Sequence, residues 1–203
     1  QLVHLLVVVL EHGPQRLRRC LFDPELLDRF VEFRRNRRRT VRPLAVALDW
    51  QAVDIDTLIE EQAGDTAAGV FRSGGEGAFR AIESQVIERV AAMHNVVVAT
   101  GGGSVLAESN RAAMRRKGFI VCFDARPETI AARIQDSTAH VSERPLLAGG
   151  NPLAKIIELK SERDAIYAQA DFIIQTDELT PDQVTHQVLL AFRERSAVAG
   201  GTA

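Results

Sequence analysis

Two aspartates, Asp54 and Asp56, close a short alternating stretch at residues 51–56 (QAVDID) that predicts a β-strand. Side chains two residues apart on a strand point the same way, so this pair suits a hydrated Mg²⁺ ion or a substrate hydroxyl. The alternative is purely structural, because an aspartate here could form an Asx turn or cap a helix that begins near Thr57. The residue types alone leave both interpretations open.

Three consecutive glycines, Gly101, Gly102 and Gly103, follow the apolar run 96–100 (VVVAT). Without a Cβ atom, their backbone N–H groups could approach a ligand closely. The alternative is a tight turn from a strand into a helix. The lysine and the serine or threonine of a Walker A phosphate loop do not follow these glycines, so the triplet alone does not indicate a phosphate site.

Arginines that could bind anions are spread over three segments. Arg80 lies on the flank of a predicted helix, Arg144 lies in a Gly/Pro-containing stretch, and Arg163 precedes Tyr167 near the end of another helix. Each alone is typical of a solvated surface arginine. Together they could supply the planar, two-pronged donors that bind carboxylate and phosphate groups.

Short apolar runs alternate with helical periods beyond about residue 45, which predicts an α/β domain with a parallel sheet. In such sheets ligands gather at the carboxyl ends of the strands, where the aspartates and the glycines fall. The helix at 76–94 shows this periodicity best. The expected strands are 51–56, 96–100, 119–123 and 172–176, and the expected helices are 76–94, 109–117, 126–134, 153–167 and one from Pro181.

Composition excludes several classes of protein. The chain has 203 residues, 46% hydrophobic and 26% charged, with a net charge of −2, which is the balance of one globular domain without bias toward nucleic acid or membrane. No apolar run approaches the roughly 18 residues that span a bilayer. Cys20 and Cys122 are far apart, so we expect reduced thiols in a cytoplasmic protein.

The region before about residue 40 differs from the rest. Its first residues (LVHLLVVVL) predict a buried strand or a helix fragment, and six of the nine residues at 34–42 are arginine. Nucleic-acid binding through this cluster is a weak alternative, since charge runs are usually solvated and only Phe33 stands beside it. We therefore expect an atypical Arg-rich segment at 1–40, the α/β domain at 41–195 and a flexible tail at 196–203.

The order of several motifs resembles the shikimate kinase family. They are VDIDTLIEEQAG, GEGAFRAIE, VVVATGGGSVL, RPLL, SERDAIY and IIQTDELTP. The resemblance implies a three-layer α/β sandwich with a central parallel sheet flanked by helices, P-loop-kinase-like, with a lid loop. It also implies ATP-dependent phosphorylation of the 3-hydroxyl of shikimate in aromatic amino-acid biosynthesis, with Mg²⁺, by a cytoplasmic monomer that needs no nucleic acid or membrane. Gluconate and adenylate-type kinases share the fold but not the ATGGGSV and FRAIE pair.

The resemblance also assigns roles to the candidate residues. Asp54 matches the residue that holds Mg²⁺ through water, and Asp56 matches the residue that binds substrate hydroxyls and serves as base. The carboxylate of shikimate is bound by the pair Arg80 and Arg163. Glycine amides of Gly101, Gly102 and Gly103 contact substrate, and Arg144 matches a lid arginine that closes over ATP and stabilises the transferring phosphoryl group.

One element of the family is missing from this sequence. No G-x-x-x-x-G-K-[ST] motif occurs, and the positions where family spacing places it read VEFRRNRRR, so Arg37 stands near the expected lysine. Bulky side chains there would prevent the backbone from forming a phosphate nest. We consider two explanations, a frame-shifted reading before about Thr40 and a diverged N-terminus. The alternative function is accordingly a non-catalytic module that binds shikimate or a partner protein.

Overall fold

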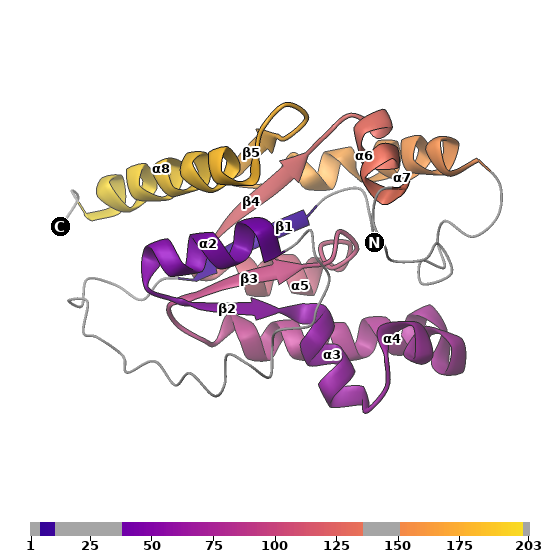
Figure 1. Cartoon of the computed structure of the whole chain (residues 1–203). Coiled ribbons are helices and arrows are strands. Elements are labelled where there is room, and N and C mark those ends of the chain that lie inside the picture. The colour runs from indigo at the N-terminus through magenta and orange to yellow at the C-terminus, as the bar shows by residue number, and fades with distance from the viewer. Residues whose placement is uncertain (1–4, 11–37, 136–150, 201–203) are drawn as a thin grey trace.

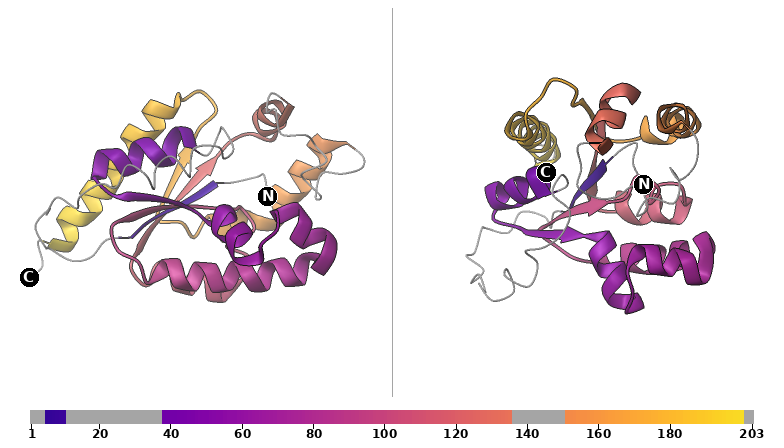
Figure 2. Two further views of the ribbon diagram at one scale, coloured as in Figure 1. Left: turned by 60° about the horizontal axis from the view of Figure 1, so that its bottom comes forward. Right: turned by 45° about the vertical axis from the view of Figure 1, so that its right-hand side comes forward.

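The computed structural model describes residues 5–10, 38–135 and 151–200. These residues form a five-stranded sheet between layers of helices (Figures 1 and 2). The strands are β1 (Leu5–Leu10), β2 (Gln51–Asp54), β3 (Val96–Thr100), β4 (Gly118–Asp124) and β5 (Phe172–Gln175). The helices are α2 (Arg38–Leu48), α3 (Ile55–Ala63), α4 (Ala67–Ala91), α5 (Glu108–Arg115), α6 (Pro127–Gln135), α7 (Pro152–Tyr167) and α8 (Pro181–Gly200).

The sheet has the strand order β2-β3-β1-β4-β5, with β2 parallel to β3 and β4 parallel to β5. The predicted α/β sandwich is therefore confirmed. The expectation that every strand is parallel is wrong for β1, which lies antiparallel to both neighbours and pairs Leu6 with Thr100 and with Cys122. Strand β1 is an unbroken apolar run, so its side-chain pattern does not specify in which direction it pairs.

Two apolar layers hold the helices on the sheet. On one face, α2 and α8 pack through Leu44, Val188 and Phe192 against the buried side chains of β3 and β4. On the other face, α3, α4 and α5 enclose the larger cluster around Ile55, Phe79 and Val86. Helices α6 and α7 lie together beyond the carboxyl end of β4 (Figure 2). Within the described ranges, no helix is long and apolar enough to cross a membrane.

Element boundaries follow local chemistry and shift several predictions by a few residues. The apolar stripe predicted within 76–94, which consists of Phe79, Ile82, Val86 and Val90, is confirmed: three of the four are buried, and Ile82 is partly buried against the same cluster. Helix α4 begins earlier than expected, because Thr66 caps it by accepting a hydrogen bond from the Gly69 N–H at 3.0 Å. It is kinked at Gly75, whose φ of 72° suits a residue without a Cβ. Helix α8 continues to Gly200, five residues past the expected domain boundary.

Candidate active site

The junction of β2 and α3 positions the two aspartates. The strand ends at Asp54, so the expectation of one strand through residue 56 is wrong. Asp54 caps α3, because its Oδ1 atom accepts a hydrogen bond of 2.9 Å from the N–H of Asp56, which lies buried in the first turn. The structural alternative, helix capping, is therefore confirmed for Asp54. Since Asp54 pairs with Ala99 in the sheet, both carboxylates still lie beside the end of β3.

The three glycines form a buried turn directly after β3. The turn is closed by bonds from the Ser104 N–H to the Gly101 carbonyl at 3.0 Å and from the Leu106 N–H to the Gly103 carbonyl at 3.1 Å. Helix α5 supports it through Asn110, whose side chain donates to the Ser104 carbonyl. Positive φ angles among the described glycines occur at Gly64 and Gly75 only. None of the three glycines is therefore required for a left-handed backbone.

Gly103 leaves space for a neighbouring side chain. A Cβ atom added there would come within 2.5 Å of Nη2 of Arg80, so the guanidinium lies directly against the glycine backbone. The Nη1 atom of Arg80 pairs with Oε2 of Glu83 at 2.6 Å, and Glu83 is fully buried. The other Glu83 oxygen, Oε1, accepts from the Ser104 hydroxyl at 2.6 Å. Arg80 is thus clamped at the glycine turn by a carboxylate that is shielded from solvent.

Sequence reasoning missed Glu83 and Ser104. The signal for Glu83 was present, because it lies four residues after Phe79 and three before Val86, within the buried stripe of α4. A charge at a core position three residues from an arginine indicates a buried pair. No comparable signal marked Ser104, whose contact with Glu83 spans 21 residues of sequence.

Helix α7 brings a second arginine to the same turn. The Tyr167 hydroxyl donates to the Gly102 carbonyl at 2.8 Å, and Arg163 lies one turn earlier with 7% of its surface exposed. In the part of the chain that the structure describes, the Nη1 atom of Arg163 is buried without a hydrogen-bond partner. Burial raises the pKa of Tyr167, and the charge and hydrogen bond of Arg163 oppose that rise. A desolvated cationic donor of this kind is completed by an anion.

These residues form one unit, which we call the glycine-turn site: Arg80, Glu83, Gly101, Gly102, Gly103, Ser104, Arg163 and Tyr167. One guanidinium contacts Gly103, and Tyr167 joins the helix of the other to Gly102. The structure therefore places two of the arginines that the sequence singled out, Arg80 and Arg163, on helices that contact the same glycine turn. Two guanidinium groups beside one turn could bind a small carboxylate.

The structure tests the remaining candidate residues, those for ATP and Mg²⁺, only in part. Arg37 and Arg144 lie outside the described residues. Among the residues that are described, no group of three or more His, Cys, Asp or Glu side chains could hold a metal ion. Asp54 and Asp56 are the two carboxylates that the structure places together at the junction of β2 and α3.

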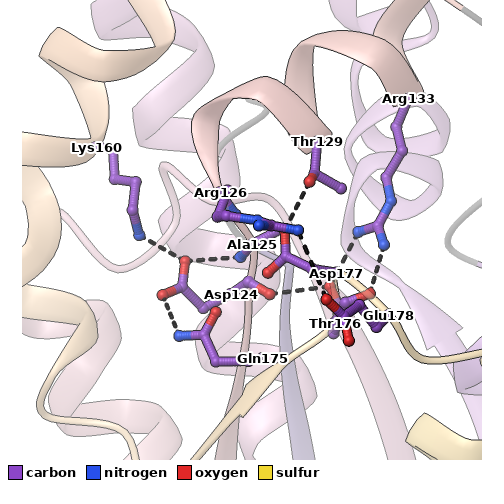
Figure 3. A network of polar contacts seen from close by, with 10 residues as sticks. All are labelled: Asp124, Ala125, Arg126, Thr129, Arg133, Lys160, Gln175, Thr176, Asp177 and Glu178. Carbon is purple, nitrogen blue, oxygen red and sulfur yellow. Dashed lines mark hydrogen bonds and ion pairs between the residues drawn. The ribbon is translucent and has the colours of Figure 1, made fainter.

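A second polar cluster lies after β4 and β5 (Figure 3). We call it the edge network and define it by Asp124, Arg126, Thr129, Arg133, Lys160, Gln175, Thr176 and Asp177. The sequence indicated only one of its members, Thr176, as a polar residue at the carboxyl end of a predicted strand. Arg133 donates to the Thr176 hydroxyl at 2.9 Å, and the Thr129 hydroxyl donates to Asp177 at 2.6 Å. The network ties α6 and α7 to the carboxyl ends of two neighbouring strands.

The strand order and the helices on both faces of the sheet are those of a small α/β kinase fold, which belongs to a class of phosphotransferases. A family model described as shikimate kinase matches residues 38–193. The chain belongs to the shikimate kinase family. The match begins at Arg38, the first residue of α2, and so leaves out the region that lacks the Walker A motif.

Individual relatives agree with this assignment. The chain is 42% identical to a shikimate kinase of Symbiobacterium thermophilum over 76% of its length and 88% of that protein. It is 36% identical to one of Thermoanaerobacter pseudethanolicus over 74% of its length and 86% of that protein. Among solved structures, shikimate kinase from Acinetobacter baumannii in complex with shikimate superposes with a TM-score of 0.69 at 28% identity, covering 76% of this chain and 85% of that one.

Proposed function

We propose that this chain transfers the γ-phosphate of ATP to the 3-hydroxyl of shikimate. Membership of the shikimate kinase family and the relatives' names support the reaction. The observation that carries the proposal is the buried Nη1 atom of Arg163, which has no partner among the described residues. An unpaired guanidinium nitrogen away from water is costly, and the carboxylate of shikimate would supply the missing acceptor.

The roles within the site are those that the resemblance to the family implies, and the contacts of the site support them. Arg80 and Arg163 would bind the two oxygens of the shikimate carboxylate, and the backbone of the glycine turn would face the ring between them. Holding one end of the substrate in this way fixes its hydroxyls relative to the protein. Asp56, buried in the first turn of α3, would then hydrogen-bond the attacking hydroxyl and accept its proton.

Mg²⁺ and ATP complete the proposal. Asp54, at the end of β2, would hold Mg²⁺ through water, and the ion would neutralise charge on the phosphates. The capping bond to the Asp56 N–H engages one oxygen of Asp54 and keeps its carboxylate at the sheet edge. Arg37 and Arg144 are proposed to contact the ATP phosphates, with Arg144 also stabilising the transition state.

The comparisons give no support to the alternative of a non-catalytic binding module, since the relatives named above are shikimate kinases. The missing G-x-x-x-x-G-K-[ST] motif is the one observation that favours it. The two functions separate cleanly in experiment, because the glycine-turn site binds shikimate in both and ATP is consumed in only one.

The test pairs a coupled assay of ADP formation, with ATP, Mg²⁺ and shikimate, with calorimetric titration of shikimate alone. We expect shikimate-dependent turnover together with saturable binding. Binding without turnover would favour the non-catalytic module. The absence of both would overturn the proposed function.

Monomeric state and cytoplasmic location are further parts of the proposal. Cys122 is a free, buried thiol whose pKa burial raises to about 12, so it is an unreactive core residue. A reduced core thiol is compatible with a reducing compartment. Light scattering of the purified chain checks the oligomeric state, and a mass of twice the chain's 22.3 kDa would contradict a monomer.

A further inference from the structure

The ion pair between Lys160 and Asp124 links the edge network to the glycine-turn site. We propose that Lys160 and Asp124 are positioning residues, which set the register of α7 on the sheet and thereby place Arg163 for the substrate carboxylate. The inference rests on the proposed function, because it names a pair that controls shikimate affinity without touching shikimate.

Asp124 is a fixed point at the end of β4 (Figure 3). Its Oδ1 atom accepts from the Ala125 N–H at 2.8 Å, and its Oδ2 atom accepts from the Gln175 side chain at 2.8 Å. Both donors belong to the sheet or to the residue directly after it. The orientation of the Asp124 carboxylate therefore does not depend on α7. Lys160 then donates to Oδ1 at 2.6 Å, and both side chains are mostly buried, at 18% and 16% exposure.

Arg163 lies between two anchors of α7. Lys160 is three residues before it and bonds the end of β4, whereas Tyr167 is four residues after it and bonds the turn that follows β3. Residues at these spacings share one stripe of a helix. The two anchors therefore fix both the rotation of α7 and its position along its own axis at the point where Arg163 lies.

Apolar packing alone fixes this register less well. Ile156 and Leu159 pack against Ile130 and Ile134 of α6, and such contacts have no preferred direction. A slip of one residue moves a helix by about 1.5 Å and turns it by about 100°. Binding geometry tolerates displacements of only about 0.5 Å. Directional bonds at both ends of the stripe exclude such a slip.

Among the described residues, a second carboxylate also lies near the lysine. Asp164, on the same helix, lies 3.6 Å from Lys160 Nζ and is 57% exposed. This contact lies within α7 and says nothing of where the helix sits on the sheet. In Asp124→Asn, Lys160 therefore keeps its charge and an anionic partner but loses its bond to the sheet. In Lys160→Met the lysine charge itself is lost. Comparing the two variants separates the position of α7 on the sheet from the charge of the lysine.

The experiment is calorimetric titration of shikimate into the full chain and four variants. We expect Lys160→Met to weaken binding roughly tenfold or more, because misplacement of about 1 Å can cost up to 100-fold. Lys160→Arg should recover most of the affinity. Asp124→Asn keeps the side-chain shape but removes the charge and replaces one acceptor oxygen by a donor, so it should weaken binding while remaining folded. The matched control is Lys155→Met on the same helix, which removes an exposed pair with Glu158 and should leave affinity unchanged.

A double-mutant cycle distinguishes a positioning role of Lys160, exerted through Arg163, from a role in overall stability alone. If Lys160 acts through Arg163, the effect of Lys160→Met on affinity shrinks in an Arg163→Lys background. Equal effects in both backgrounds, or wild-type affinity in both Lys160→Met and Asp124→Asn, would overturn the positioning role while leaving the proposed function intact. Absence of shikimate binding by the unaltered chain would instead overturn the proposed function, and the positioning role with it.

Discussion

The glycine-turn site and the edge network lie at the same edge of the sheet, yet they handle charge in opposite ways. In the edge network each charged side chain has a protein partner, such as Lys160 with Asp124 and Arg126 with Asp177. In the glycine-turn site Arg80 is satisfied by buried Glu83, whereas one nitrogen of Arg163 is buried without a partner in the described structure. The difference indicates that the edge network holds helices and strands together, whereas the glycine-turn site can still bind an anion.

The comparison also explains why both clusters are needed. Apolar layers place α4 and α7 against the sheet, but only directional bonds fix each arginine to within a fraction of an ångström. Glu83 does this for Arg80 from inside the core. The edge network does it for Arg163 from the neighbouring strands. Substitutions in the two regions should therefore differ in how strongly they change shikimate affinity and the free energy of unfolding.

The largest effect is expected for Glu83→Ala. It removes the acceptor of both Arg80 and the Ser104 hydroxyl in a fully buried position, so the free energy of unfolding should fall by about 3 kcal/mol. Urea unfolding measures this change. The matched control is Glu76→Ala, which removes the exposed partner of the same arginine and should change stability by less than about 0.5 kcal/mol. Equal effects of the two substitutions would contradict the buried clamp.

The next largest effect is expected for Arg163→Ala, on binding. The shikimate carboxylate loses a charge-assisted bond worth about 1.5–3 kcal/mol, so calorimetric binding should be lost or greatly weakened. Arg116→Ala serves as control, because Arg116 is exposed and pairs with Glu88, which is not part of the glycine-turn site. An unchanged affinity in the first variant would refute the role of Arg163.

Gly103→Ala tests the space at the glycine turn. The added methyl would displace the Arg80 guanidinium, which Glu83 prevents from moving freely, so we expect shikimate affinity to fall about tenfold. Gly77→Ala is the matched control on α4, since its Cβ would meet no atom within 4 Å. It should leave affinity unchanged and stabilise the helix by about 0.5–1 kcal/mol. Full affinity in Gly103→Ala would show that the turn tolerates a side chain.

The smallest effect concerns the edge network and pH. Bonds from the Thr129 hydroxyl, first, and then from Arg126 hold the pKa of Asp177 below its ordinary value, against the opposing effect of burial. Because the folded-state pKa is the lower one, this stabilisation is present at neutral pH and is lost as the pH falls through that value. Asp177→Asn should therefore cost about 1 kcal/mol of unfolding free energy near neutral pH.

Urea unfolding of both proteins across the acid range measures the pH effect. The difference between them should vanish once Asp177 is protonated in the unaltered chain. A difference that stays constant from neutral to acid pH would show that the charge of Asp177 contributes nothing to the edge network. Shikimate affinity near neutral pH should change little in Asp177→Asn.

Sequence periodicity predicted most elements, because a helix stripe such as Phe79, Val86 and Val90 and a buried strand such as β3 have distinct patterns. It could not give the direction of β1, since an apolar run pairs either way. The end of β2 was misplaced because Asp54 suits a strand end and a helix cap equally well. Apart from Thr176, the edge network was missed because its bonds join residues 36 to 52 positions apart, such as Lys160 with Asp124 and Thr176 with the Asp124 carbonyl.

The central claim is that the glycine-turn site binds a carboxylate. The most direct test compares the affinity of the full chain for shikimate with its affinity for the methyl ester of shikimate, which keeps the ring and hydroxyls but carries no negative charge. We expect the ester to bind at least tenfold more weakly, since charge-assisted bonds to both arginines are lost, about 1.4 kcal/mol or more. Equal affinities would contradict the account.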